Sequence, residues 1–258
     1  MTRIIALANQ KGGVGKTTTA INLGAALAEL GSEVLIIDID PQANATSGLG
    51  LRGVEGPSSY DLLIGDVELA NAIVPTAFER LSVVPSTPDL AAAEVEMASM
   101  MAREFKLKRA IEGRTGRFDF VLLDCPPSLG LLTVNGLTAS DEVIIPVQCE
   151  YLALEGLGQL KITLDLVRRN LNRDLILRGL ILTMYDRRTN LSEQVAQEVR
   201  RHFSNTFHAV VPRSVRVSEA PSHGLPISVY DPTSPAAEAY AALAKEVQNG
   251  VAMTEVSP

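Results

Sequence analysis

Short runs of apolar residues recur along the chain, and longer segments of mixed polarity separate them. The runs lack the strict alternation of apolar and polar positions that marks a half-buried strand. Near-continuous apolar runs are typical of strands that are covered on both faces. They predict strands at residues 3–9, 34–38, 81–85, 118–124, 142–147, 177–185 and 209–212.

The segments between these runs carry apolar residues at helical spacing. Val195, Val199 and Phe203, for example, repeat every four residues and form one apolar stripe. Helices are predicted at residues 17–30, 90–112, 155–171, 191–203 and 235–248. Strands that alternate with helices predict an α/β fold: a doubly wound, mostly parallel sheet with helices on both faces.

The length of 258 residues fits one large domain, which we expect to span residues 1–250, with a flexible tail at 251–258. Hydrophobic residues make up 46% of the chain and Trp is absent, which indicates an aliphatic core. No apolar run approaches the length that crosses a bilayer, and the first run reaches the charged Lys11 too early for a signal peptide. A cytoplasmic protein is therefore expected.

The two cysteines, Cys125 and Cys149, lack the close spacing of a metal site, and we expect both to be buried apolar residues. The three histidines also lack metal-ligand spacing.

The formal net charge of −7 hides an asymmetry along the chain. Residues 1–150 sum to −8, whereas residues 156–216 sum to +6. Taken alone, the basic stretch fits solvated helix faces and a patch for a polyanion equally well.

The stretch NQKGGVGKTTTAINL follows the first predicted strand directly and runs into an alanine-rich helix. Strand, glycine loop and helix are the context of a phosphate-binding loop, because glycines let backbone N–H groups surround an anion at the positive end of the helix. This context disfavours a purely structural glycine turn. By this reasoning Lys16 reaches the β and γ phosphates of a nucleotide, Thr17 coordinates Mg²⁺ and Thr18 donates to the α-phosphate. The predicted nucleotide-binding residues of the loop are Lys11, Gly12, Gly13, Val14, Gly15, Lys16, Thr17 and Thr18.

Three carboxylates stand at the ends of predicted strands, where open α/β sheets bind ligands. Asp38 and Asp40 close the second apolar run, and Asp124 ends the run FDFVLLD. A charged carboxylate is costly to bury alone, so a metal or another cation is expected beside Asp124.

The loop departs from the usual form G-x-x-x-x-G-K-[ST], since Gln10 stands where glycine is expected and Lys11 is an additional lysine at its start. It resembles the loop of the deviant Walker A family of P-loop ATPases, which includes ParA, MinD, the nitrogenase iron protein and amide-forming synthetases. The resemblance implies that Lys11 reaches across an ATP-sandwich dimer to the partner's phosphates and that Asp40 positions the attacking water. The implied catalytic residues are Lys11, Lys16 and Asp40; the implied metal-site residues are Thr17, Asp40 and Asp124, with Asp38 structural or linked to the metal.

Further segments, including DIDPQANATSGLG, DCPPSLGLLTVNGL and PRSVRVSEAPSHGLPISVYDP, resemble chromosomal ParA proteins of the Soj type from residue 3 to about 248. This resemblance implies a chromosome or plasmid segregation ATPase that uses ATP and Mg²⁺, dimerises with ATP and binds double-stranded DNA without sequence preference. It also implies a place on the nucleoid and stimulation of hydrolysis by a ParB partner.

The Soj-type resemblance assigns contacts late in the chain. Met184 and Pro212, with Tyr185 and Arg213 beside them, are implied at the adenine, although Tyr185 fits core packing equally well. Arg213 and Arg216 are the implied DNA contacts. Further basic residues extend this patch in the same interpretation, although the last two fit a solvated helix face equally well: Lys161, Arg168, Arg169, Arg187, Arg188, Arg200 and Arg201.

Two other functions within the deviant Walker A family remain as alternatives. A MinD-like membrane-associated positioning ATPase is expected to end in a basic amphipathic helix, but here the last predicted helix holds one basic residue, Lys245. An ATP-dependent amidoligase gives no reason for the basic region. An iron–sulfur carrier needs cluster cysteines, and Cys125 with Cys149 do not supply that pattern.

Overall fold

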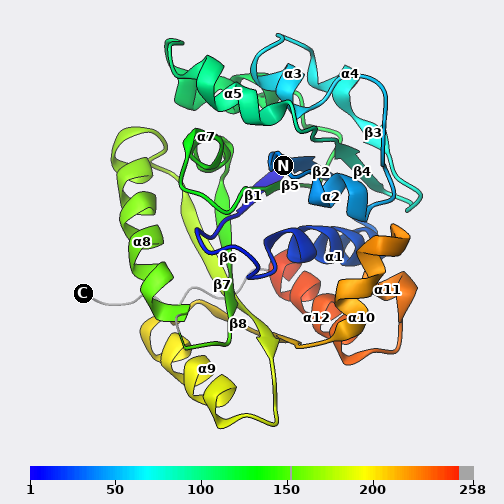
Figure 1. Cartoon of the computed structure of the whole chain (residues 1–258), viewed down its shortest axis with the longest axis vertical. Helices are drawn as coiled ribbons and strands as arrows, with labels where there is room; N and C mark the ends of the chain where they lie inside the picture. The colour runs from blue at the N-terminus through cyan, green and yellow to red at the C-terminus, as the bar shows by residue number, and fades with distance from the viewer. Residues whose placement is uncertain (152, 250–258) are drawn as a thin grey trace.

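A computed structural model describes residues 1–151 and 153–249, and for residues 153–156 the backbone alone. The predicted flexible tail at 251–258 lies outside the described residues. A twisted sheet runs through the centre of the molecule in the order β3-β4-β2-β5-β1-β6-β7-β8 (Figure 1). Its neighbouring strands are parallel except for the pair β3 and β4. The strands are β1 (Arg3–Leu7), β2 (Val34–Asp38), β3 (Val74–Pro75), β4 (Leu81–Val84), β5 (Phe120–Asp124), β6 (Glu142–Gln148), β7 (Ile176–Tyr185) and β8 (Thr206–Pro212).

Helices cover both faces of the sheet, as the apolar strands require. One apolar cluster joins the sheet to α3 (Ser59–Leu63), α4 (Leu69–Ala72), α5 (Leu90–Met97), α6 (Lys106–Ile111), α7 (Leu131–Ala139), α8 (Ala153–Asn170) and α9 (Asn190–His202). A second cluster joins the opposite face to α1 (Lys16–Glu29), α2 (Asn44–Gly48), α11 (Ile227–Tyr230) and α12 (Pro235–Asn249). The predicted doubly wound α/β fold is therefore confirmed (Figure 1).

The seven predicted strands are all present, within a few residues of their expected ends. The two-residue strand β3 was not predicted, because it is too short to form an apolar run. The single helix predicted at 90–112 is wrong: the chain forms α5, a 3₁₀ turn at Arg103–Phe105 and then α6. Ala102 adopts a left-handed conformation (φ 51°), and the Asn135 side-chain oxygen accepts from the Leu107 N–H at the start of α6. The conformation of Ala102 breaks the helical path.

Helix α7 was also missed in the sequence. Most of its residues are buried, and the polar residues Thr133, Asn135 and Thr138 are among them, so the helix shows no apolar stripe with an opposite polar face. It follows β5 directly and covers the strand ends that carry the site.

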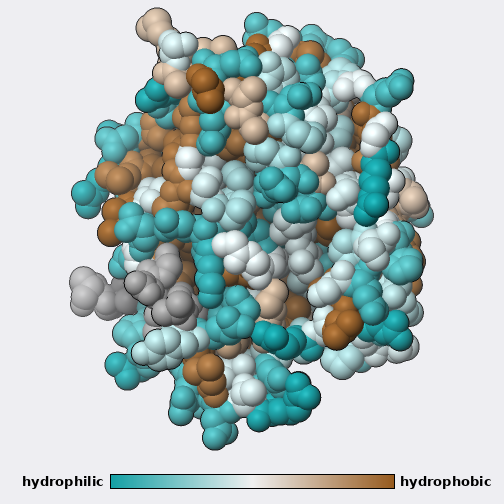
Figure 2. Space-filling model, in the orientation of Figure 1, coloured by the Kyte–Doolittle hydropathy of each residue, from teal (hydrophilic) through white to brown (hydrophobic). Residues whose placement is uncertain are grey.

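The face shown in Figure 2 is mostly polar, with apolar side chains gathered on the side of α8. Ile162 and Leu166 are the exposed large apolar residues of that helix. Within the described residues, none of the helices has the length and apolar character needed to cross a membrane.

The strand register brings three predicted site segments to one edge of the sheet. Asp38 at the end of β2 pairs with Asp124 at the end of β5, and Asp124 pairs with Leu7 at the end of β1. The carboxyl ends of parallel strands thus place both carboxylates beside the loop that follows β1.

Candidate nucleotide-binding site

The glycine loop joins β1 to α1 at the carboxyl edge of the sheet. Gly15 precedes the first residue of α1 and has a left-handed backbone (φ 91°), which a residue with a Cβ adopts only with strain. In the described part of the chain, the N–H groups of Gly13 and Gly15 donate to no protein acceptor. Free N–H groups at the start of a 14-residue helix form a site for an anion.

Lys16 lies inside this loop and is 6% exposed. Its Nζ donates to the Lys11 carbonyl at 3.3 Å. Burial lowers the pKa of the Lys16 ammonium, and the neighbouring carboxylates of Asp124 and Asp40 act in the opposite direction. The Lys11 side chain, in contrast, is half-exposed at the start of the loop.

Asp38 is fully buried and works as a structural acceptor. Its carboxylate accepts from the Asp40 N–H at 3.2 Å, the Thr46 N–H at 2.9 Å and the Thr46 hydroxyl at 2.7 Å. Burial raises its pKa to about 6, and these hydrogen bonds oppose the rise. Asp38 therefore fixes the loop that runs from Asp40 into α2.

Asp40 lies at the start of this loop, 5% exposed. Its Oδ1 accepts from the Gln42 N–H at 2.9 Å, and its carbonyl accepts from the Ser86 hydroxyl at 2.8 Å. The Ser86 N–H donates in turn to the Thr46 hydroxyl at 2.9 Å. The position of Asp40 is therefore set by a hydrogen-bonded network between two loops.

Asp124 is the site carboxylate that receives no hydrogen bond from the described residues. It is fully buried, and neither of its oxygens has a hydrogen-bond partner among the described residues. Burial and the nearby Asp38 charge raise the pKa of Asp124, whereas the Thr17 side chain and the Lys16 ammonium offset the rise only in part. An orphaned buried carboxylate beside an anion-binding loop fits a divalent cation held jointly with phosphate oxygens.

The predicted adenine residues lie on the adjoining edge. Met184 has a left-handed backbone (φ 51°) near the end of β7, and the next residue, Tyr185, pairs with Pro212 of β8. The Tyr185 side chain is partly buried against the core of the α8 and α9 layer, as the core-packing interpretation expects, and its hydroxyl donates to Glu193 of α9. Met184 directly follows Thr183, whose hydroxyl donates to the Val14 carbonyl in the phosphate loop at 2.8 Å. Met184 is therefore adjacent in the chain to a residue that contacts the loop, and Pro212 lies on the neighbouring strand β8, paired with Tyr185.

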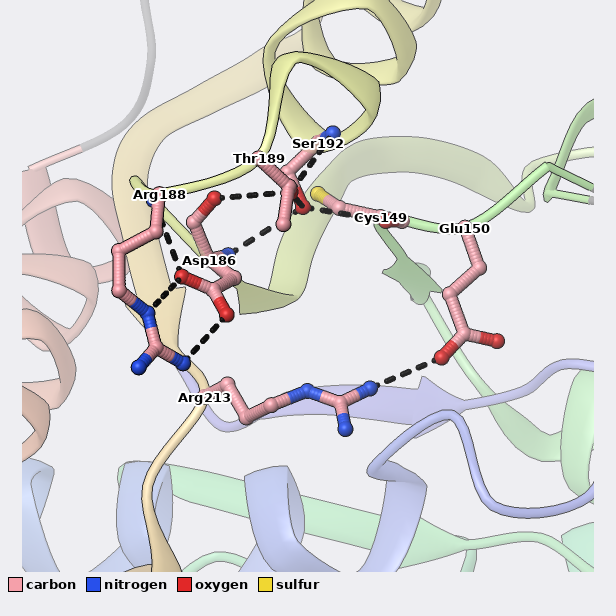
Figure 3. Close-up of polar contacts among 7 residues, drawn as sticks. All are labelled: Cys149, Glu150, Asp186, Arg188, Thr189, Ser192 and Arg213. Atoms are coloured by element: carbon pink, nitrogen blue, oxygen red, sulfur yellow. Dashed lines mark hydrogen bonds and ion pairs between the residues drawn. The ribbon is translucent and has the colours of Figure 1, made fainter.

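The predicted DNA-contacting arginines are exposed, and acidic neighbours hold both. The Arg213 side chain is 56% exposed and contacts Glu150 at 2.9 Å, next to the turn where the Arg188 guanidinium donates two hydrogen bonds to Asp186 (Figure 3). Arg216 is the second residue of α10 (Val215–Glu219). Its side chain is 60% exposed and contacts Glu219 at 3.4 Å.

The wider basic patch is divided between the two layers of helices. Arg216 lies on α10, near α11 and the helices of the α1 layer. The other predicted members lie on α8, on α9 or in the loop before α9: Lys161, Arg168, Arg169, Arg187, Arg188, Arg200 and Arg201.

Four polar residues shape the site without having been singled out in the sequence: Asn9, Thr46, Ser86 and Thr183. The side chain of each residue forms a hydrogen bond that joins two segments of the site. The one signal available for Thr183 was a hydroxyl within the apolar run LRGLILTMY.

Comparisons with known proteins show which family the chain is similar to. Residues 2–177 match the family model described as an AAA domain. The chain is 55% identical to the sporulation initiation inhibitor protein Soj of Bacillus subtilis, over 96% of this chain and 98% of that protein. It is 51% identical to the chromosome partitioning protein ParA of Myxococcus xanthus, over 95% of this chain and 87% of that protein.

Among solved structures, the fold is similar to the cobyrinic acid a,c-diamide synthase of Mycobacterium smegmatis with a bound ATP analogue and magnesium. The TM-score is 0.85 and the identity 41%, over 96% of this chain and 95% of that one.

Proposed function

The chain belongs to the ParA/Soj family of P-loop chromosome-partitioning ATPases, and on this premise we propose that it forms an ATP-sandwich dimer that binds DNA non-specifically. It is an ATPase that uses ATP and Mg²⁺. The proposal extends to one ATPase domain over residues 1–250, to a place on the nucleoid and to a ParB-type partner that stimulates hydrolysis.

The observation that carries the nucleotide site is the orphaned carboxylate of Asp124 beside the loop that holds Lys16. Thr17, Asp40 and Asp124 would hold Mg²⁺, which supplies positive charge that neutralises the phosphates. The N–H groups of the loop and the Lys16 ammonium would then bind the β and γ phosphates.

Hydrolysis, in this proposal, relies on positioning and on charge. Asp40 orients the attacking water, and its own orientation depends on the bonds to Gln42 and Ser86. Lys11, whose side chain is half-exposed, adds positive charge to the phosphates bound by the partner subunit. Dimerisation is thereby linked to the presence of ATP.

A physical contact supports a link between the nucleotide site and the DNA-binding segment. Gly50, just after α2, packs against Gly224, and a Cβ at Gly224 would lie 2.7 Å from the Gly50 Cα. The Asn22 side chain of α1 also accepts from the Ile227 N–H at 2.6 Å. The segment that carries Arg216 therefore rests on the two elements that follow the phosphate loop and Asp40.

Arg213 and Arg216 are proposed as phosphate contacts, which are independent of base sequence and weaken with salt. Each subunit offers few such contacts, so a monomer would bind weakly. A dimer that presents both sets on one duplex would gain affinity through avidity.

The test is retention on non-specific duplex DNA without nucleotide, with ADP and with a non-hydrolysable ATP analogue, at two salt concentrations, with dimerisation followed in parallel. We expect salt-sensitive retention of a dimer with the ATP analogue alone. Asp40→Ala should give the same retention with ATP itself, because hydrolysis stops while binding persists.

Failure to bind DNA in every state, despite ATP binding, would overturn the partition proposal. Lipid vesicles would then test a MinD-like role. ADP formation that depends on a carboxylate substrate and an amide donor would indicate an amidoligase, the activity that the name of the Mycobacterium smegmatis protein describes.

A further inference from the structure

Two side chains tie the phosphate loop to strands that come much later in the chain. Asn9 donates from Nδ2 to the Pro146 carbonyl of β6 at 2.7 Å, and its Oδ1 accepts from the Lys11 N–H at 3.0 Å. Thr183 of β7 donates from Oγ1 to the Val14 carbonyl at 2.8 Å. The loop is thus held near both of its ends before any nucleotide binds.

The bond from Thr183 acts on one peptide group in particular. A trans peptide directs its carbonyl and its N–H in opposite directions. Because the Val14 carbonyl is directed at β7, the N–H of the same peptide, which belongs to Gly15, is directed away from β7. That N–H has no protein acceptor among the described residues.

The surroundings of Thr183 leave little freedom for another arrangement. Thr183 is 2% exposed, and its own carbonyl accepts from the Cys149 N–H at 3.0 Å, which fixes its backbone in the sheet. The Thr183 methyl would lie 3.7 Å from a Cβ at Gly15, so the strand and the loop are in van der Waals contact at this point. A rotated Val14–Gly15 peptide would leave both the hydroxyl and a buried carbonyl without partners, which is costly.

We propose that Thr183 is a positioning residue for nucleotide binding: its hydroxyl orients the Val14–Gly15 peptide so that the Gly15 N–H is presented to a nucleotide phosphate. This inference rests on the proposed nucleotide site and deepens it. Preorganised donors bind an anion more tightly because no reorientation accompanies binding.

Thr183→Val removes the hydroxyl and keeps the size and branching of the side chain. We expect the Kd for a non-hydrolysable ATP analogue to rise about tenfold, the effect of losing roughly 1.4 kcal/mol. The KM for ATP should rise by a similar factor, with kcat within about twofold of wild type. Thr183→Ser, which restores the hydroxyl, should return the Kd to within about threefold of wild type.

Thr206→Val is the matched control. The Thr206 hydroxyl donates to the Phe203 carbonyl at 2.7 Å at the start of β8, away from the loop. This substitution removes a comparable bond, and the Kd should stay at the wild-type value.

Tripolyphosphate, used as a competitor, distinguishes an effect on phosphate binding by the loop from an effect on adenine binding, because it carries phosphates and no adenine. Its inhibition constant should rise in Thr183→Val by the same factor as the Kd of the ATP analogue. An unchanged inhibition constant of tripolyphosphate would show that Thr183 acts on adenine binding near Met184. An unchanged Kd for the ATP analogue would show that Thr183 has no role in binding. Either result overturns the inference.

If Thr183→Val does not fold, Thr183→Ala, whose side chain is smaller, serves in its place. Its Kd for the ATP analogue must rise by the same factor, while the Kd of Thr206→Val stays at the wild-type value. The proposed site itself is tested separately by the wild-type protein and Lys16→Ala. Wild-type binding that depends on Lys16, together with an unaffected Thr183 variant, would reject this inference and leave the proposed function standing.

Discussion

The phosphate loop and the segment from Arg213 to Gly224 hold their charged groups in opposite ways. Lys16 in the loop is 6% exposed, and Asp124, which ends β5 beside the loop, is 0% exposed. A long-range hydrogen bond from the core strand β7 positions the loop. Arg213 and Arg216 are 56% and 60% exposed and contact acidic side chains at the surface.

This difference fits two kinds of ligand. A nucleotide needs donors in fixed positions in a water-poor site, where each interaction is strong. A DNA backbone needs cations that exchange one anionic partner for another at little cost, because exposed ion pairs are weak. The first region should therefore respond sharply to single substitutions and the second only gradually.

The largest effect is expected in the loop, for Lys16→Ala. Loss of a buried ammonium that binds phosphate should weaken affinity for ATP and ADP at least about 100-fold, or roughly 3 kcal/mol. Calorimetry or fluorescent nucleotide titration measures it.

Lys11→Ala is the matched control for Lys16→Ala. It should keep nucleotide affinity within about threefold while losing ATP-dependent dimerisation, because Lys11 is proposed to act on the partner's phosphates. Equal losses in the two variants would contradict the distinct roles.

The contact between the two regions is tested next, by Gly224→Ala. Gly224 has φ 69°, and a Cβ would lie 2.7 Å from the Gly50 Cα and 3.0 Å from its nitrogen. Left-handed strain and overpacking should together lower the free energy of unfolding by about 2–3 kcal/mol.

Gly53→Ala separates left-handed strain from overpacking, because Gly53 has φ 67° and a Cβ there would meet nothing within 4 Å. It should cost about 1 kcal/mol. Thermal unfolding compares the two variants, and equal shifts would mean that the Gly50 contact does not constrain the arginine segment.

A smaller effect is expected for Arg216→Glu. Retention of the ATP-bound dimer on DNA should fall about tenfold, with a salt dependence shallower by about one phosphate contact for each subunit. Hydrolysis measured without DNA should be unchanged, since the ion pairs of Arg216 are with Glu219 and Asp231 of its own segment.

Arg114→Glu makes the same charge change near the start of β5, at the opposite end of the strands, and should leave retention intact. Loss of basal hydrolysis in Arg216→Glu would contradict the separation of the two regions.

The smallest effect is expected for Glu150→Gln, which releases Arg213 from its 2.9 Å contact. Because an exposed pair is worth about 0–1 kcal/mol, affinity for DNA should rise only about two- to threefold. Glu79→Gln removes the same charge from an 89% exposed side chain at the other end of the sheet and is the control. A large gain in Glu150→Gln would mean that this ion pair holds the surface in a closed form.

Local patterns predicted most of the fold and the outline of the site. Apolar runs located every strand except the two-residue β3, and the flanking strand and helix identified the phosphate loop. Two of the failures have local causes as well: buried polar residues of α7 remove its apolar stripe, and the left-handed Ala102 interrupts a segment whose composition favours helix throughout.

The sequence by itself determined which residues lie in the loop, because a strand, three glycines and a helix start are contiguous in the chain. It also placed Asp38, Asp40 and Asp124 at strand ends. Only the tertiary structure decided which of these carboxylates receives hydrogen bonds and which strands hold the loop. Asp38 obtains its donors from Thr46 and Asp40, Asp124 has none among the residues that the structure describes, and Thr183 meets Val14 across 169 positions of the chain. Hydrogen bonds and burial depend on distances in space, and those distances arise only when the parallel strands align.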